Sequence, residues 1–454
     1  MKSHTVRRLV TALAGSAALT AALAAPGVAS ASTQCSGGPV TGQGAAALKI
    51  AEVSVWGPGF NLGSNPTACS GSQGSGETPK ASYTSSSSGA GGESWGINGH
   101  AASFGPTNAF IGTEEPPSLT QEEEIEKAAG APLTTVLTIP VTQEAIAIIV
   151  HLPTGCLATS TAAPGRLVIS NSILEKIFQG TSTEWKNITG DGDKYLNDGT
   201  EKCPIIAKGA KVHITRAVRE DSAGTTAILK KYFFLTQKKA VAGSDTWDEL
   251  VATGTPNLTW PNESDTLLRV KGDSGLATKV GTEPGTIGYV SLADARASLD
   301  FTPSPGTGGA NTPAFWLEVQ NGAGIYADPS TDGDVAAKAN SNCEGTKYTN
   351  GKKKFPPPTT LEQWNEVTTA VKETEYTICN FAFDLALDGY HNYPSTTAGE
   401  ALTVENFLQF TLNSASEGGQ QLILNNDYLP LPTSTEPKQN VLKIAQEGAS
   451  KVTF

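Results

Sequence analysis

The sequence predicts an α/β protein whose sheets are mostly parallel. Continuous apolar runs such as AIAIIV at 145–150 are typical of strands that are buried on both faces. These runs alternate along the chain with stretches whose apolar residues recur at helical spacing, which is the pattern of an α/β fold. With 454 residues, of which 38% are hydrophobic, the chain can fill two domains of ordinary size.

The first residues predict a secretory signal peptide. Lys2, Arg7 and Arg8 precede an apolar stretch at 9–25, and a cleavage site of small residues ends at Ala31. We therefore expect cleavage near Ala31 and a soluble, extracytoplasmic protein in the periplasm or at the cell surface. A retained N-terminal anchor is the alternative.

The net charge argues against a nucleic-acid partner. The whole sequence carries −12, and removal of residues 1–31 takes away three basic residues and no acidic one, which leaves −15. Nucleic-acid binding depends on Lys and Arg that neutralise phosphates. We predict a monomer without a nucleic-acid partner, although one small anion in a locally positive site is compatible with this charge.

Six cysteines in an exported chain predict disulfides. Six thiols allow 15 pairings, and we predict that neighbours along the chain pair because each bridge then closes a short loop. The predicted pairs are Cys35–Cys69, Cys156–Cys203 and Cys343–Cys379. Because no two of these cysteines form a CxxC pair, we predict neither a zinc site nor a cofactor.

The first half of the chain contains three further local patterns. Residues 64–92 are rich in Ser and Gly and predict long surface loops around a short strand. EEEIEK at 122–127 predicts the solvated start of a helix. SNSILEKIFQG at 170–180 begins with a cap and ends at Gly180, which predicts a short amphipathic helix.

The second half continues the alternation of strand and helix. KVHITR at 211–216 alternates as a strand, and apolar residues at 228–233 follow with helical spacing. Lys230 and Lys231 are expected to point away from the core. Two more elements are predicted downstream: a strand at 286–290 (TIGYV) and an amphipathic helix at 403–412 (TVENFLQFTL).

The stretch REDSAGTT at 219–226 lies between that strand and that helix and has the residues of an anion site. The first turn of a helix has free N–H groups and the positive end of the helix dipole. Arg219 can form a two-pronged bond to an oxyanion, Asp221 can hold the guanidinium, and Gly224 lets a ligand approach the backbone. The alternative is a plain helix cap at Asp221 or Ser222, with Arg219 in a surface ion pair.

Seven motifs resemble those of the phosphate-binding proteins of bacterial phosphate ABC importers, which have the type II periplasmic-binding-protein fold. A single motif is a weak signal, but seven in the family's order over most of the mature chain are specific. They are TGQGAAAL, YTSSSSGAGG, FGPTNAF, LEKIFQGTSTEWKNI, REDSAGTT, GDSGLATKVGTEPGTIGYV and YLPLP. Without the resemblance, YTSSSSGAGG would indicate a flexible linker.

The resemblance implies two α/β lobes, joined by crossover strands, that close on an oxyanion. It also implies inorganic phosphate as the ligand and a membrane ABC permease as the partner. The first crossover is expected around 145–150. The implied boundaries are 32–150 for the first part of lobe 1, 151–296 for lobe 2, and 297–454 for the return to lobe 1, with an insertion at about 301–378.

In lobe 1, the resemblance implies that Ser88 donates its hydroxyl and Gly89 its N–H to the anion. Two positions depart from the family. Ala46 stands where the family has a Ser or Thr donor. Asn108 stands where an Asp accepts the proton of hydrogen phosphate, and this carboxylate excludes sulfate. We expect weaker binding and reduced discrimination, because an amide can either accept or donate.

In lobe 2, the resemblance implies that Arg219 pairs with phosphate and that Asp221 orients it. Gly224 and Thr225 match the donors at the helix start. Ala223 replaces a ligand hydroxyl and keeps only its backbone N–H.

Three classes of function follow: a phosphate-binding protein for an importer, a secreted sensor or interaction module with weakened binding, and an enzyme. GDSG at 272–275 resembles a serine-protease nucleophile motif, but no His stands in the matching context. A phosphatase would need an activated nucleophile or a metal cluster, and the sequence indicates neither. We therefore predict that the chain is not an enzyme.

Overall fold

The computed structural model describes most of the chain after the predicted signal peptide. That peptide and Cys35, Cys69, Cys156 and Cys203 lie outside the described residues. The described residues are 37–61, 79–130, 134–153, 168–185, 188, 212–237, 247, 250, 257–264, 266–299, 314–321, 324–330, 343, 355–358, 364, 367, 376–393, 395–437 and 440–454.

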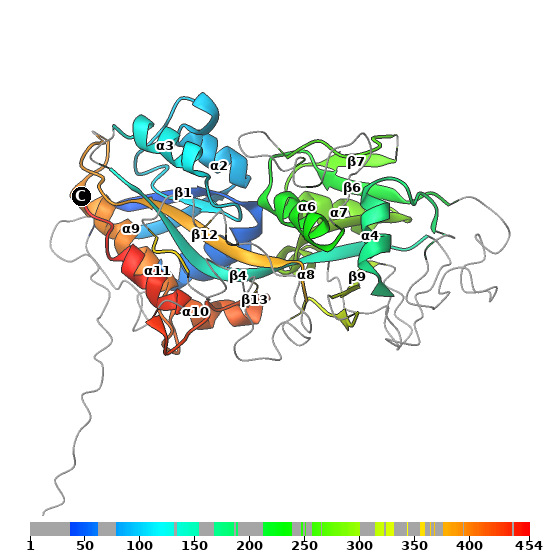
Figure 1. Ribbon diagram of the computed structural model, residues 1–454. Helices are drawn as coiled ribbons and strands as arrows, with labels where there is room; N and C mark the ends of the chain where they lie inside the picture. Colours follow the sequence, from blue (N-terminus) through cyan, green and yellow to red (C-terminus); the bar gives the residue numbers. More distant parts are fainter. Residues whose placement is uncertain are drawn as a thin grey trace, which may run out of the picture. The chain divides into compact units, whose positions relative to one another are not determined.

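A mixed sheet forms the centre of the fold, and its strands lie in the order β2-β1-β3-β12-β4-β8-β6-β7 (Figure 1). Strands β9 and β13 also pair with β4, and β11-β10-β5 form a small second sheet. The strands are β1 Pro39–Gly44, β2 Lys80–Ser85, β3 Ile111–Thr113, β4 Val136–His151, β5 Val168–Ile169, β6 Thr215–Arg219, β7 Leu267–Val270, β8 Thr286–Ser291, β9 Ala314–Trp316, β10 Glu318–Gln320, β11 Tyr326–Ala327, β12 Cys379–Leu387 and β13 Tyr428–Leu429.

The expectation of mostly parallel sheets is wrong. Strands β1, β2 and β3 run parallel to one another, and so do β6, β7 and β8. The long strands β4 and β12 are antiparallel to each other and to the strands beside them. The physical reason is that β4 runs between the two parallel groups and β12 returns in the opposite direction.

The apolar run at 145–150 lies within β4, which is buried along its whole length. The first part of β4 pairs with β12 and β13, and the part from Ile146 onward pairs with β8 and β9. Its side chains enter two separate hydrophobic cores: Val136 to Val141 pack in one core, and Ala145 to Val150 pack in the other. One strand therefore connects both cores.

The described residues of the 301–378 segment contribute to both cores. Phe315, Trp316 and Val319 pack in the core that contains β6 and β8, whereas Phe355 and Trp364 pack in the core that contains β1 and β3. The lobe boundaries given above stay predictions.

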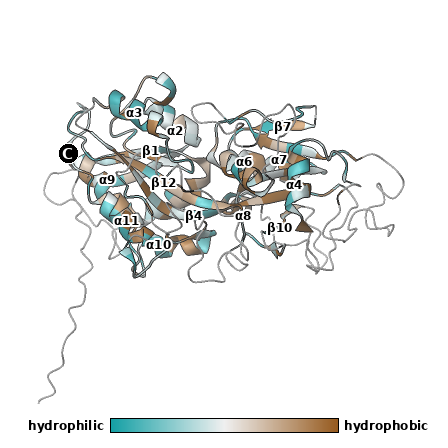
Figure 2. Ribbon diagram, in the orientation of Figure 1, coloured by the Kyte–Doolittle hydropathy of each residue, from teal (hydrophilic) through white to brown (hydrophobic). Residues whose placement is uncertain are grey.

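Helices cover the sheet, and Figure 2 shows the polar residues of α3 in teal and hydrophobic stretches of the strands in brown. Helix α4 begins after the cap Ser170 and is followed by Gly180 at φ 73°, as the sequence predicts. The helices are α1 Gly57–Asn61, α2 Ser88–Ser94, α3 Leu119–Ala128, α4 Asn171–Phe178, α6 Gly224–Gln237, α7 Asp273–Thr282, α8 Leu292–Leu299, α9 Ala398–Thr411, α10 Gly419–Leu422 and α11 Val441–Ala449, with 3-10 turns η1 Ala46–Leu48, η3 Ile97–Gly99 and η6 Ile423–Asn426 and a π-helix η2 Ile50–Trp56.

Several predicted elements differ in detail from the structure. Helix α2 occupies part of the stretch predicted as loop, and its cap Ser87 accepts a hydrogen bond from the N–H of Ala90. Strand β6 begins at Thr215 rather than at Lys211. In α3, Glu122 is buried and accepts a hydrogen bond from the Thr138 hydroxyl, so the start of this helix is only partly solvated.

The structure confirms the predicted disulfide between Cys343 and Cys379. None of the helices in the described residues combines the length and the hydropathy that a membrane-spanning helix needs.

The prediction that Lys230 points away from the core is wrong. Its side chain is fully buried, and its ammonium donates to the carbonyls of Leu250, Asn257 and Thr259. The ammonium also lies 4.6 Å from the ring centre of Trp260. These carbonyls come from further along the chain, and the helical pattern of α6 cannot reveal them.

We expect Lys230→Met to lower the free energy of unfolding by about 3 kcal/mol, because three buried carbonyls lose their donor. Chemical denaturation would measure the change. The neighbouring Lys231→Met is the matched control, and we expect it to cost less than about 1 kcal/mol because Lys231 is only half-buried. Equal losses in the two variants would contradict this explanation.

Candidate anion-binding site

Strand β6 and helix α6 hold the two ends of the REDSAGTT stretch. The strand ends at Arg219 and the helix begins at Gly224, so the stretch forms the connection that the sequence predicts. The connection is fixed from a third element, because the Asn257 amide donates to the carbonyl of Ala223 at 2.8 Å. The first turn of α6 is therefore held in one place.

Arg219 is fully buried, and carboxylates hold its guanidinium on two sides. Its Nε donates to Asp221 at 2.7 Å, and its Nη2 donates to the second oxygen of the same carboxylate. Its Nη1 donates to Asp273 at 2.7 Å and to the Thr225 hydroxyl at 3.2 Å. Asp221 thus holds the guanidinium. The two-pronged hydrogen bond that the sequence predicted for an oxyanion is made to the Asp221 carboxylate instead. Of the five N–H groups of an arginine, four are bonded to described residues, and within those residues the second N–H of Nη2 has no acceptor.

Burial opposes the charge of Arg219, but Asp273 and then Asp221 raise its pKa above the ordinary value. Burial likewise opposes ionisation of Asp221, yet the hydrogen bonds from Arg219 lower the pKa of this carboxyl. Both groups of this pair are therefore charged. Asp221 also accepts the N–H of Gly272 at 3.1 Å, which connects the pair to the start of α7.

The first turn of α6 presents backbone donors. Within the described residues, the N–H groups of Ala223, Gly224 and Thr225 have no protein acceptor. Gly224 has to be glycine here, since a Cβ at this position would lie 2.4 Å from the Cβ of Glu114 and 2.9 Å from the Ser88 hydroxyl oxygen. The donors of α6 therefore lie close to the loop after β3 and to the start of α2.

Ser88 and Gly89 contribute to this group in different ways. The Ser88 hydroxyl oxygen accepts the N–H of Glu114 at 3.3 Å, so its O–H is available to donate elsewhere. The N–H of Gly89 donates to the carbonyl of Ser222 at 3.0 Å, and a Cβ on Gly89 would lie 2.6 Å from the Ser222 side chain. Gly89 therefore joins α2 to the loop before α6, and its N–H is not free for a ligand.

The other two predicted lobe 1 residues are Ala46 and Asn108. Ala46 begins the short turn η1, whose neighbour Lys49 approaches Ser274 of α7 at 3.5 Å. Asn108 is buried, and its amide nitrogen donates to the Ser94 hydroxyl at 3.0 Å and to the carbonyl of Ser103. The structure brings together Ser88, Gly89 and the 219–226 stretch. The amide nitrogen of Asn108 is bonded to Ser94 and Ser103 instead.

We expect Asn108→Asp to lower the free energy of unfolding by about 1–3 kcal/mol, because a carboxylate cannot donate to Ser94 and Ser103. Thermal unfolding of the purified variant would measure the loss. Asn98→Asp is the control, since Asn98 is exposed at φ 60°, where Asp is also tolerated. An Asn108→Asp variant as stable as the control would contradict the assignment of these hydrogen bonds.

Three carboxyl groups near the donors were not identified from the sequence: Glu114, Glu144 and Asp273. Asp273 stands in the GDSG motif, where it begins α7 and contacts Arg219 directly. Ser274 of the same motif donates to Asp294 at 2.8 Å. In the sequence, the only indication of Glu144 is that it is a lone charged residue beside the apolar run of β4. Glu114 follows directly after β3.

Burial dominates the acidity of these carboxyls. It raises the pKa of Glu114 well above the ordinary value, and Glu144 and Asp273 raise it further, against the opposing effect of Arg219. Burial, with Asp273, raises the pKa of Glu144 to about 8. Burial also raises the pKa of Asp384, which lies on β12, to about 8. Burial therefore favours the uncharged form of these groups.

We expect the protein to lose stability as the pH rises from about 5 to about 9. A carboxyl whose pKa is raised on folding stabilises the folded state fully below its unfolded pKa near 4.5, and this contribution is lost as the pH passes about 8. Glu144→Gln and Asp384→Asn should each reduce the slope, as measured by denaturant unfolding at several pH values. An unchanged slope in both variants would contradict the assigned ionisation.

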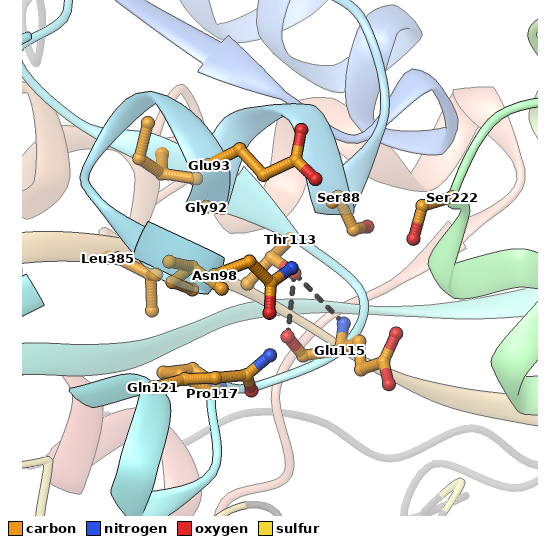
Figure 3. Close-up of a pocket in the computed structure, with 13 residues that line it drawn as sticks. Ser88, Gly92, Glu93, Asn98, Thr113, Glu115, Pro117, Gln121, Ser222 and Leu385 are labelled. Carbon is orange, nitrogen blue, oxygen red and sulfur yellow. Dashed lines mark hydrogen bonds between the residues drawn. The ribbon is translucent and has the colours of Figure 1, made fainter. Parts of the chain in front are cut away.

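A pocket opens beside the donors, between α2, η3, β3 and the start of α3 (Figure 3). Ser88 and Ser222 lie at one side of it, where the Gly89–Ser222 hydrogen bond joins α2 to the loop before α6. Glu93 and Glu115 also line it, and Thr113 holds the Glu115 backbone with two hydrogen bonds. The pocket gives a small solute access to the neighbourhood of Ser88.

The fold agrees with a comparison against known families. A family model described as a PBP superfamily domain matches residues 77–414, which is most of the chain. The chain belongs to the PBP superfamily. The matched residues include Ser88, Arg219 and the first turn of α6, so the site lies inside the PBP domain.

Solved structures confirm the type II fold of this PBP domain. PfluDING, described as a high-affinity periplasmic phosphate-binding protein bound with phosphate, is 17% identical with a TM-score of 0.55, over 92% of this chain and 99% of that one. The phosphate-binding protein from Stenotrophomonas maltophilia is 15% identical with a TM-score of 0.52, over 90% and 93% of the two chains. At these identities the likeness shows the fold.

Curated PBP relatives are named phosphate-binding protein PstS. The one from Xylella fastidiosa is 27% identical over 188 residues, which are 40% of this chain and 41% of that protein. The one from Haemophilus influenzae is 25% identical over 276 residues, which are 59% and 63%. The chain thus spans about two fifths of the length of the first of these relatives.

Proposed function

We propose that this chain is an extracytoplasmic solute-binding protein that binds phosphate, or a related tetrahedral oxyanion, for an ABC importer. The observation that carries the proposal is the first turn of α6. Three backbone N–H groups without a protein acceptor lie there, close to the Ser88 hydroxyl and next to the buried guanidinium of Arg219. Fixed donors of this kind replace the water of a small anion at low cost in reorganisation.

Each residue has a separate role in this proposal. The N–H groups of Ala223, Gly224 and Thr225 bind the anion at the positive end of the α6 dipole. Ser88 donates its hydroxyl from the other side, and Arg219 supplies positive charge and its remaining N–H. Roles for Ala46 and Asn108 stay predictions from the family resemblance.

Closure of the site involves Gly89. Its hydrogen bond to Ser222 connects residues of the proposed lobe 1 (32–150 and 297–454) and lobe 2 (151–296). We propose that this bond forms when the lobes close and breaks when the anion leaves, so that Gly89 acts as a latch. The tight approach of Gly89 to Ser222 supports this role, because any side chain at Gly89 would collide.

Export and partner follow from the same proposal. The leader is removed near Ala31, and the folded protein delivers its anion to a membrane permease. The protein holds its ligand without transforming it. In agreement with this, the hydroxyl of Ser274 donates to Asp294, as in a structural turn, and its oxygen lies near the ammonium of Lys49.

We expect Ser88→Ala to weaken phosphate binding about threefold to tenfold, because one neutral hydrogen bond contributes about 0.5–1.5 kcal/mol. Calorimetric titration with inorganic phosphate would measure the affinity. Ser85→Ala is the matched control, since Ser85 is exposed on the neighbouring strand β2, and it should leave the affinity unchanged. Equal affinity for phosphate in wild type and Ser88→Ala would remove Ser88 from the site.

A specific observation supports the second candidate, a secreted sensor or interaction module with weakened binding. Four of the five N–H groups of Arg219 already bond to the protein, and Asp273 adds a second carboxylate beside it. Both features oppose an incoming anion. Titration with phosphate, sulfate and arsenate separates the two candidates, because the absence of heat with all three anions would favour the module.

A further inference from the structure

The N–H of Gly224 is the middle one of the backbone donors at the start of α6. This N–H and the carbonyl of Ala223 belong to one peptide group. A peptide group is planar and trans, so its N–H and its C=O point in opposite directions. A contact that holds the carbonyl of Ala223 therefore also sets the direction of the N–H of Gly224.

The carbonyl of Ala223 is held by donors from the helix and by one side chain. The N–H groups of Thr226 and Ala227 donate to it at 3.1 and 3.2 Å, as in the first turn of a helix. The amide nitrogen of Asn257 donates to it at 2.8 Å from outside the helix. An alanine has no side-chain oxygen that could cap the helix, so the outside contact at this end of α6 comes from Asn257.

The Lys230 ammonium fixes Asn257 in turn. Asn257 is 3% exposed, and its backbone carbonyl accepts a hydrogen bond from the Lys230 ammonium at 2.7 Å. The same ammonium donates to the carbonyls of Thr259 and Leu250 at 2.8 and 3.3 Å. A protonated lysine has three N–H donors, and each has a carbonyl acceptor here. Lys230 therefore holds the backbone around Asn257 against α6.

Lys230 and Ala223 lie on the same face of α6. They are seven residues apart in the sequence, which is about two helical turns, or roughly 10 Å along the helix axis. Asn257 connects the two positions, because its backbone is bound to Lys230 and its side chain to Ala223. Both contacts are made behind the Ala223–Gly224 peptide, on the side of its carbonyl.

We propose that Asn257 and Lys230 are positioning residues of the anion site: Asn257 directs the N–H of Gly224 at the ligand through the carbonyl of Ala223, and Lys230 keeps Asn257 in place. The inference rests on the proposed function and names side chains that set its affinity without touching the ligand. A hydrogen bond to the carbonyl also polarises the peptide group, which makes its N–H a stronger donor.

Asn257→Leu removes the amide donor at nearly unchanged side-chain size. We expect it to weaken phosphate binding about tenfold, because the N–H of Gly224 is no longer held towards the anion. Calorimetric titration with inorganic phosphate, at a temperature where the variants are folded, measures the affinity. Asn61→Leu is the matched control, since the Asn61 amide also donates to a carbonyl at 2.8 Å, that of Ala81 on β2. This control should lose stability and keep the wild-type affinity.

A double-mutant cycle separates positioning from a general loss of stability. We expect Lys230→Met alone to weaken phosphate binding about threefold to tenfold. In the Asn257→Leu background the same change should weaken binding by less than about twofold, because Lys230 acts through Asn257. Full and independent losses from the two changes would contradict the proposed connection.

The Gly224 amide can also be observed directly by NMR. Labelling with carbonyl-¹³C alanine and ¹⁵N glycine selects the amides of glycines that follow an alanine, and Gly224 is one of them. Phosphate should shift the Gly224 amide proton in the wild type and in Asn61→Leu, and the shift should be clearly smaller in Asn257→Leu. A loss of stability alone would not change this signal.

The remaining outcomes distinguish the inference from the proposed function. An Asn257→Leu variant that binds phosphate as tightly as the wild type, with the same Gly224 shift, would overturn the inference and leave the proposed function standing. Should Asn257→Leu not fold, Asn257→Ala supplies the same test with the same expectation. The absence of phosphate binding in the wild type would overturn the proposed function itself.

Discussion

The site depends on a single buried cation, Arg219, and on the carboxylates that hold it. A guanidinium without contact to water is tolerated because Asp221 and Asp273 contact it on two sides. These contacts fix the end of β6, the connection to α6 and the start of α7 relative to one another. The free N–H groups of α6 therefore have a fixed direction, and the arrangement is ready before a ligand arrives.

The contacts of Arg219 with Asp221 and Asp273 also limit the affinity expected for an anion. An arginine that gives both prongs to a carboxylate has little left for a ligand, so in the proposed function an anion gains most of its hydrogen bonds from backbone groups and Ser88. Backbone donors carry no net charge and do not titrate. The charge balance of the site is therefore controlled by its carboxyl groups, chiefly Glu114, Glu144 and Asp273.

The sequence predicted local features well and spatial neighbours poorly. The strand at 145–150, the capped helix ending at Gly180 and the strand–loop–helix around REDSAGTT depend on local periodicity and on caps, which the sequence displays. The burial of Lys230 depends on carbonyls further along the chain, and the approach of Glu114 to Ser88 and Gly224 depends on residues far apart in the sequence. The spacing of residues along the sequence does not predict such long-range contacts. Antiparallel β4 and β12 were missed for the same reason.

Strand β4 connects both hydrophobic cores, and Glu144 is located where its pairing partners change from β12 and β13 to β8. A strand that is hydrogen-bonded on both sides is stiff, so any rotation of one core against the other has to bend it near this change of partners. A titratable side chain thus stands where β4 passes from one core to the other. The two cores are therefore connected through a short stretch of backbone that carries an ionisable group.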